Sequence, residues 1–496
     1  MKNFNKMFFW MFFIQIFSML WSSINYNIDL ITHVSEIAEY NSNSDFGVSD
    51  VWGYTDETGV EYAIVGYRYG TFIFDVSTNP NNPILIADII GPSEGDYYFH
   101  RDYKTYNDHL YIVNEMYGID VGMQIIDLSP LPNGKPLKRN TYTQITQSHN
   151  LWIDIDLGFG FIEKNYPENI HVVDFVNPDN PTHNANFNYQ DGENCHDIYT
   201  VNNMAFISEG YNYQFGIYDI SNILEPTFLA SIPSFGYAHN AWLNTAGTHL
   251  VTGEETVGMT IKIWDVQNFN NINMVGEYLG ENSLTHNVHV KDDFLYVSHY
   301  TSGLKILDIF NPADPIEVAA YDTYPDNDSE GFYGCWGAFP FSKNNFIYAS
   351  DMQYGLFVFE FNNIQAGWAH GNVIKNHEFL SGVKIISLLN EKVFISNFNG
   401  EYAFGFPAGI QEFQIFQNDI LLDTILIPLV AHEIIEHDII LDTYGDANGD
   451  DEINILDVIF LINQILSNEY TTTSDLNADG VINILDIIQL INLILY

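Results

Sequence analysis

Cysteine and basic side chains are scarce in this 496-residue sequence. The two cysteines, Cys195 and Cys335, are too few for a disulfide framework, so stability must come from burial, with bound metals as a further source. Only 16 lysines and arginines stand against 64 aspartates and glutamates, which gives a formal net charge of −48. Such an acidic surface repels phosphate backbones and attracts cations. The composition therefore argues against nucleic-acid binding and favours a role for cations.

Long hydrophobic runs are also rare, and the clearest one lies at the start of the chain. Lys2 and Lys6 precede the apolar stretch 7–21, and Ser22 and Ser23 follow it. This order predicts a secretory signal peptide over residues 1–23. An uncleaved anchor is the alternative, but the stretch is short for a bilayer span. No later stretch could cross a membrane, so we expect a secreted, extracellular mature chain without a membrane span.

A short pattern recurs through the middle of the chain: a small residue, alternating apolar residues and then an acidic residue. It occurs at 70–75, 122–127, 169–174, 215–219, 260–265, 303–308 and 355–360, at intervals of 43 to 52 residues. Aromatic residues make up 15% of the chain, which also favours strands. Units of this length with several alternating apolar runs are typical of propeller blades. We therefore predict a mainly β protein whose residues 28–361 form a seven-bladed β-propeller of four-stranded blades.

The last of these units stops after its third strand, near Phe361, and would leave an unpaired sheet edge. Residues 31–40, near the start of the mature chain, match the pattern of the fourth strands. Because closed rings avoid exposed edges, we expect this N-terminal segment to complete the last blade.

Two acidic segments near the C-terminus, 446–457 and 475–486, share one pattern of side chains. Oxygen-bearing side chains recur at loop positions 1, 3, 5, 9 and 12, and position 7 offers its backbone carbonyl. Calcium takes about six to eight oxygen ligands from one such loop. Each loop leads into an apolar helix, predicted at 458–466 and 487–495; a pair of acidic turns without an ion is the alternative. The predicted calcium ligands are Asp446, Asn448, Asp450, Glu452, Asn454, Asp457, Asp475, Asn477, Asp479, Val481, Asn483 and Asp486.

On these motifs, residues 444–496 resemble a type I dockerin, a small α-helical module. The resemblance implies two bound Ca²⁺ ions and docking to a cohesin domain, with attachment to a cell surface through that partner as one arrangement. Asp451 replaces the usual glycine at position 6 of the first loop. The apolar pairs 455–456 and 484–485 replace the small hydroxyl residues that are common at positions 10 and 11 of dockerins. The identity of the cohesin therefore stays open.

Two further resemblances cover the rest of the chain. Residues 28–361 resemble the LVIVD-repeat propellers of the choice-of-anchor B family, through the segment 49–53, the repeated acidic strands and the His-Asn or His-Asp pairs. That family is extracellular and has no settled activity. Residues 367–441 contain short strands separated by Gly and Asn turns, and they resemble a carboxypeptidase regulatory-like β-sandwich.

Five of the predicted blades open with histidine and a polar residue, and a glutamate or histidine follows 13 to 15 residues later. The two strands concerned are antiparallel, so these side chains are expected to converge at the mouth of a central channel. The candidates are His100, Glu115, His149, Glu163, His196, Glu209, His239, Glu254, His286 and His299. Such a set suits zinc, manganese or iron, or shared acid–base work. For the histidines, a structural role, a transition-metal site and catalysis without a metal all stay open. For Cys195 and Cys335, an inert role, a role as metal ligands and a disulfide between them stay open.

The segment 432–437 imitates a zinc-protease motif. Its two histidines are five residues apart, whereas that motif needs a spacing of four on a helix, and the surrounding isoleucines favour a strand. No catalytic residue is therefore assigned. The sequence predicts a secreted, non-catalytic binding or scaffold protein, tethered by its dockerin and associated with polysaccharide metabolism. The alternative is a metal-dependent extracellular hydrolase or lyase with its His/Glu site at the channel mouth.

Overall fold

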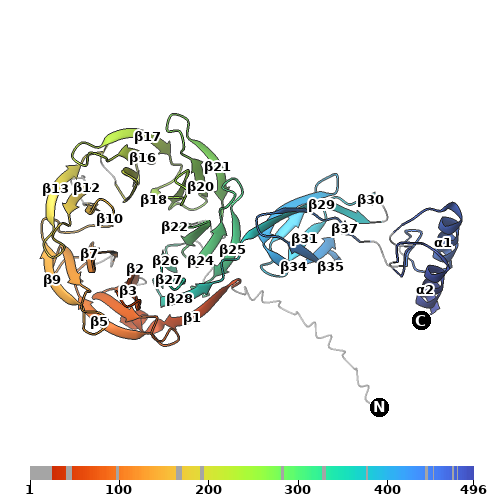
Figure 1. The fold of residues 1–496 in the computed structure, drawn as a ribbon, viewed down its shortest axis with the longest axis horizontal. Helices are drawn as coiled ribbons and strands as arrows, with labels where there is room; N and C mark the ends of the chain where they lie inside the picture. The colour runs from red at the N-terminus through yellow and green to blue at the C-terminus, as the bar shows by residue number, and fades with distance from the viewer. Residues whose placement is uncertain are drawn as a thin grey trace, which may run out of the picture.

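A computed structural model describes residues 25–495 except 41–46, 96–99, 164–169, 190–194, 281–283, 327–330, 376–377, 442–444, 451, 472–473 and 478. The predicted signal peptide and Asp451 therefore lie outside the described residues. The protein is mainly β, as predicted, and Figure 1 shows a ring of sheets, a smaller β unit and a pair of helices.

The ring consists of four-stranded antiparallel sheets whose strand order follows the chain from the axis outward, except for the outer strand of the last sheet. Their inner strands are β2 (Val48–Thr55), β6 (Arg101–Tyr106), β10 (Leu151–Asp154), β14 (Asp197–Val201), β18 (Ala238–Leu243), β22 (Asn287–Lys291) and β26 (Cys335–Phe339). The second strands are β3 (Glu61–Tyr67), β7 (His109–Asn114), β11 (Phe159–Ile162), β15 (Met204–Ser208), β19 (His249–Glu254), β23 (Phe294–Ser298) and β27 (Phe346–Asp351). The third strands are β4 (Gly70–Asp75), β8 (Met123–Asp127), β12 (Ile170–Asp174), β16 (Gln214–Asp219), β20 (Ile261–Asp265), β24 (Leu304–Asp308) and β28 (Gly355–Phe361). The outer strands are β5 (Ile84–Ile90), β9 (Leu137–Tyr142), β13 (Thr182–Phe187), β17 (Thr227–Pro233), β21 (Asn273–Tyr278), β25 (Ile316–Tyr321) and, in the last sheet, β1 (Ile28–Val34).

The last sheet combines both ends of this region. Strand β1 pairs antiparallel with β28, with Ile28 opposite Phe361 and Val34 opposite Leu356. This closing strand lies earlier in the chain than predicted, because Ser35–Tyr40 form a 3₁₀ helix, η1, instead of strand. Ile28 and Phe361 are buried in the same hydrophobic cluster, so closure covers apolar surface as well as a sheet edge.

The repeated aspartate ends the third strand of each sheet in which it occurs. Asp308 Oδ1 accepts a hydrogen bond from the backbone N–H of Phe310 at 2.7 Å, and Asp127 does the same for Ser129 at 2.8 Å. Such Asx turns satisfy a backbone donor where the ladder stops. The repeated aspartate in the sequence therefore marks the ends of the third strands.

The smaller β unit has two sheets. Strand β29 (Ala366–Lys375) pairs with β30 (Glu378–Phe379), β33 (Glu401–Pro407), β36 (Ile434–Glu436) and β37 (Ile439–Ile440), and the second sheet has the order β32 (Val393–Ile395), β31 (Lys384–Ser387), β34 (Gly409–Gln417) and β35 (Ile420–Leu429). One buried cluster, which includes Val373, Phe404 and Phe413, draws on both sheets. The segment 432–437 contains a strand, as predicted.

The ring and the β unit meet around Asp308. Its Oδ2 atom accepts the backbone N–H of Ala366 at 2.8 Å and lies 3.2 Å from His432 Nε2. The His432 ring stacks on Phe310, with centroids 3.7 Å apart. His432 is therefore an interface residue.

Helices α1 (Ile455–Ser467) and α2 (Ile484–Leu495) form the last unit, and each begins three residues earlier than predicted. Val458, Leu461, Leu476, Ile487 and Leu490 form its core. Among the described residues, no helix is long and apolar enough to cross a membrane. Cys195 and Cys335 are both free thiols.

Candidate functional site

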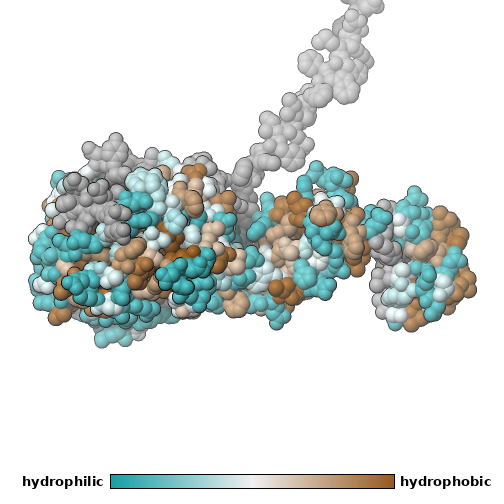
Figure 2. Space-filling model, turned by 90° about the horizontal axis from the view of Figure 1, so that it is seen from above, coloured by the Kyte–Doolittle hydropathy of each residue, from teal (hydrophilic) through white to brown (hydrophobic). Residues whose placement is uncertain are grey.

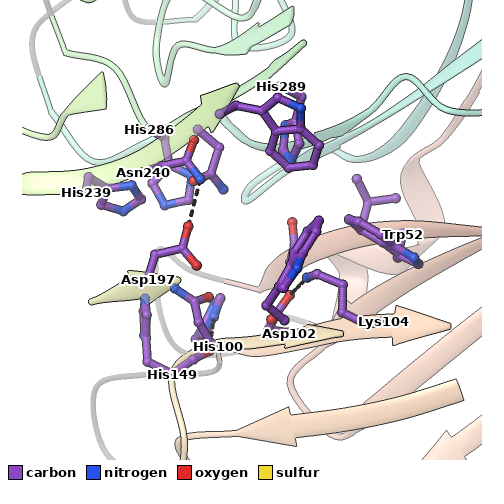
Figure 3. Close-up of a pocket in the computed structure, with 16 residues that line it drawn as sticks. Trp52, His100, Asp102, Lys104, His149, Asp197, His239, Asn240, His286 and His289 are labelled. Carbon is purple, nitrogen blue, oxygen red and sulfur yellow. Dashed lines mark hydrogen bonds and ion pairs between the residues drawn. The ribbon is translucent and has the colours of Figure 1, made fainter. Parts of the chain in front are cut away.

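The inner strands point two layers of side chains at the axis of the ring, because alternate residues of a strand face the same side. The first layer is polar, and the second layer, two residues further along each strand, is mostly aromatic. The first layer comprises Asp50, Asp102, Asn150, Asp197, Asn240 and Asn287. The second layer comprises Trp52, Lys104, Trp152, Tyr199, Trp242 and His289. All of these except Tyr199 line a cavity of about 40 Å³ (Figure 3). That volume holds only a few water molecules. The axis is thus a packed core with a small polar cavity.

Charges in this cavity are partly neutralised. Lys104 Nζ lies 2.8 Å from Asp102 Oδ1 and 4.3 Å from the centre of the Trp52 ring. Asp197 accepts a hydrogen bond from the Asn240 side chain at 2.7 Å (Figure 3). Burial raises the pKa of Asp50 well above its ordinary value and that of Asp197 to about 6.

Above these layers, five predicted histidines form a closed ring of side chains with one tryptophan. Neighbouring ring centroids lie 4.1 to 5.5 Å apart in the order His100, His149, His196, His239, His286 and Trp336. We call this set the histidine ring.

Three members of the histidine ring each link one sheet to the next by a hydrogen bond. His100 Nε2, His196 Nδ1 and His286 Nδ1 donate to the backbone carbonyls of His149, His239 and Trp336, at 2.8, 2.9 and 2.5 Å. Burial lowers the pKa of all three well below the ordinary value, so they are neutral at physiological pH. These contacts give one ring nitrogen of each of these three side chains a structural role.

His149 is charged instead. Its Nδ1 atom lies 3.1 Å from Glu115 Oε1. Burial opposes both charges, but the pairing prevails and raises the pKa of His149 to about 9 while lowering that of Glu115 to about 2. Glu163 accepts the backbone N–H of His149 at 2.8 Å, and burial raises the pKa of its carboxyl to about 7.

A carboxylate that the sequence analysis missed completes one side of the histidine ring. His239, Glu255 and His286 each offer one ligand atom, and these atoms lie within 4.8 Å of one another. The structure places the predicted Glu254 among other partners: its side chain bonds to Lys262 Nζ at 3.0 Å and accepts the backbone N–H of Gly236. Adjacent residues at a strand end face opposite ways, so one step in register exchanges the two glutamates. The signal in the sequence is the pair Glu254-Glu255, which offers both faces.

Two other predicted members of the site also lie outside the histidine ring contacts. Glu209 accepts a hydrogen bond from the Gln214 side chain at 2.7 Å, within its own sheet. His299 is buried beside Gly280, and burial together with Lys305 lowers its pKa to about 4. Repetition along the chain therefore does not give these positions equal roles.

The two predicted calcium loops are built alike. Carboxylate oxygens of Asp446, Asp450 and Asp457 lie within 4.8 Å of one another. Asp457 accepts the backbone N–H groups of Asn448 and Asn454, at 3.0 and 2.7 Å. In the second loop, Asp486 accepts those of Asn477 and Asn483 at 3.2 and 2.8 Å, and Asp475 accepts that of Asp479.

The first loop also holds an acceptor that a cation would satisfy. Asn448 Oδ1 is buried and has no hydrogen-bond partner among the described residues. Hard oxygen donors at this spacing fit calcium. Position 9 has a further role, because the side chains of Asn454 and Asn483 accept the N–H groups of Leu456 and Leu485 and so cap the two helices. Glu452 and Val481 offer backbone carbonyls, each approached by the amide of the position-9 asparagine.

Both helices expose apolar side chains. Ile455, Leu456, Ile484 and Leu485, at loop positions 10 and 11, are 52% to 62% exposed. Figure 2 shows brown, hydrophobic residues along the outer side of this unit. Surface helices normally turn polar residues outward, and contiguous exposed apolar patches mark interaction sites.

Comparisons with known proteins match two parts of the chain. Residues 444–495 match the family model of the dockerin type I domain, and residues 284–323 match that of the LVIVD repeat. A type I dockerin implies Ca²⁺ binding, and dockerin domains bind cohesin partners. No curated protein matches the chain.

Among solved structures, the chain is similar to the computationally designed Ika8 protein, with 10% identity, a TM-score of 0.43, and coverage of 67% of this chain and 99% of that one. It is also similar to U3-55K, with 8% identity, a TM-score of 0.48, and coverage of 67% and 98%. The WD40 beta propeller domain of Doa1 matches with 10% identity, a TM-score of 0.46, and coverage of 65% and 95%.

Proposed function

We propose that the chain is a secreted, non-catalytic binding or scaffold protein. A seven-bladed LVIVD-repeat propeller over 28–361 presents a ligand-binding face, and a carboxypeptidase regulatory-like β-sandwich over 367–441 acts as a spacer. The dockerin over 444–496 holds two calcium ions and docks to a cohesin-type partner. Membership of the choice-of-anchor B family, extracellular location, attachment to a cell surface through the cohesin and a role in polysaccharide metabolism belong to the same proposal.

The observation that carries this proposal is the pairing of two calcium loops with two apolar, exposed helix starts. Each loop orients the first turn of its helix, since the aspartate at position 12 also bonds to the loop backbone. Calcium binding would therefore fix the positions of Ile455, Leu456, Ile484 and Leu485. The ring of four-stranded sheets and its recurring sequence pattern support the propeller, and the two packed sheets of the β unit support the sandwich.

The test is capture of cohesin domains by the full chain, with calcium and with a chelator. We expect binding that needs calcium. The double substitution Leu456→Asp and Leu485→Asp should weaken it by about 30-fold or more, since central apolar anchors contribute about 2 kcal/mol or more. Ile410→Asp is the matched control, because Ile410 is 74% exposed on the β unit. Binding that stays unchanged when calcium is removed and when both dockerin substitutions are made contradicts the proposal.

A second candidate function is a metal-dependent extracellular hydrolase or lyase. The observation that favours it is the approach of Glu255 to two neutral ring histidines, His239 and His286. A carboxylate with two imidazoles could hold a transition metal and an activated water. Turnover of polysaccharides that requires added metal and is lost in Glu255→Gln would favour the enzyme over the scaffold.

A further inference from the structure

One position in the histidine ring departs from the repeat. Four of its histidines have a hydrogen-bonding or ionic partner within 3.1 Å of a ring nitrogen: His100, His149, His196 and His286. The ring of His239 makes no hydrogen bond among the described residues. Its Nδ1 atom is buried without a partner, and its Nε2 atom faces Glu255 Oε2 at 3.8 Å. The side chain is only 3% exposed, so bulk water does not satisfy it.

We infer that His239, Glu255 and His286 form a binding site for one divalent transition metal ion of the zinc, manganese or iron class. Two imidazoles and one carboxylate are a ligand set that these ions share. Ligands around an ion at about 2.1 Å are spaced about 3.4 Å apart in a tetrahedron. The three ligand atoms already lie within 4.8 Å of one another, so small side-chain rotations close the remaining gap.

Two of the three ligands are held in the required orientation by groups behind them. His286 donates its Nδ1–H to the carbonyl of Trp336, which leaves the Nε2 lone pair for an ion. The Tyr300 hydroxyl donates to Glu255 Oε1, which leaves Oε2, the atom that faces His239. Partners of this kind fix the tautomer and direction of metal ligands in proteins. His239 lies in a register shift of strand β18, between Ala238 and Asn240. Such bulges re-aim side chains.

Space for water adjoins two of the three ligands. The cavity of about 40 Å³ reaches both His239 and His286 (Figure 3), and one water needs about 10–15 Å³ of such space. An ion with three protein ligands keeps a further position for water or another small ligand. Neither ring nitrogen of His239 makes a hydrogen bond among the described residues, so its Nε2 atom, which faces Glu255 Oε2, can direct its lone pair at a cation.

This inference is independent of docking through the dockerin, and zinc is the probe that tests it. The full chain is stripped with a chelator, loaded with zinc in excess calcium, dialysed and analysed for metal. Excess calcium occupies the dockerin loops, which prefer hard oxygen-bound cations. We expect one zinc per chain, and cobalt in its place should give the visible absorption bands of a nitrogen- and oxygen-bound ion.

Glu255→Gln should lower zinc affinity by about 100-fold or more, because changes to second-shell partners alone lower it about 10- to 100-fold. Glu163→Gln is the matched control, a buried carboxylate beside His149 that should retain zinc. His239→Asn gives a second test should Glu255→Gln disturb folding, which circular dichroism would report. Absence of stoichiometric zinc in the parent, or equal retention by Glu255→Gln and His239→Asn, overturns the inference. Leu456→Asp with Leu485→Asp should lose cohesin and keep zinc, which separates this site from docking.

Discussion

The ion pair between His149 and Glu115 should make the stability of the ring depend on pH in a defined way. Both side chains are more than four-fifths buried, and their atoms lie 3.1 Å apart. The pKa of His149 rises from an ordinary 6.5 to about 9. Each step of one in pKa corresponds to about 1.4 kcal/mol, so the pair contributes about 3 kcal/mol. A raised histidine pKa stabilises the fold fully below about pH 6.5 and loses that effect as the pH rises through 9.

Glu115→Gln removes the partner and leaves the shape nearly unchanged. We expect the variant to be about 3 kcal/mol less stable than the parent near pH 6. Near pH 9.5 the difference should vanish or reverse, because the parent then keeps a buried carboxylate without its cation. The free energy of unfolding is measured in urea by tryptophan emission, which reports mainly on the ring through Trp52, Trp152, Trp242, Trp264 and Trp336.

The variant Glu163→Gln should show the opposite dependence of stability on pH. Burial raises the pKa of Glu163 from 4.5 to about 7, so the parent loses stability as the pH rises through this window. The glutamine variant has no such loss, so its free energy of unfolding should rise relative to that of the parent between about pH 5 and pH 8. If Glu115→Gln destabilises the ring equally near pH 6 and pH 9.5, the side chains do not form an ion pair and the reasoning is refuted.

Three more predictions follow from separate contacts. Deletion of residues 28–34 should abolish cooperative unfolding of the ring, because β28 loses its outer partner; a deletion that melts like the parent contradicts this. Asp308→Ala should destabilise the junction by about 1–3 kcal/mol and speed hydrogen exchange at Ala366, with Asp314→Ala as a milder comparison. Removal of calcium with a chelator should reduce the helical circular dichroism signal, and calcium but not sodium should restore it. Asp457→Asn should halve the amount of calcium bound. A spectrum that the chelator leaves unchanged would count against the calcium loops.

The sequence predicted the strands well because their causes are local. Alternating apolar residues define each strand, and an Asx turn such as that of Asp127 ends it. The hairpin turns have equally local causes: Asn107 and Asp108, and likewise Asn202 and Asn203, take the left-handed backbone angles of a two-residue turn. Spacing also located the histidine ring. These features depend on residues that are neighbours in the chain.

The composition of the site depended on register, which no local pattern records. The exchange of Glu254 for Glu255 follows from one step at the end of β19 and from the shift beside His239. The start of the closing strand was misplaced for a similar reason, since the register of β1 against β28 involves residues more than 300 positions apart. His432 likewise acquired its role from Phe310 and Asp308 in another unit.

The position of β28 determines how the protein responds to mechanical load. A chain held by its dockerin and pulled through a ligand on the ring transmits tension through β29 into the end of β28. That strand is not at a sheet edge, because β27 flanks it on one side and β1 on the other. Tension along it must shear two ladders of hydrogen bonds together instead of unzipping one. Placing the N-terminal strand outermost therefore protects the point where the β unit joins the ring against extraction of β28.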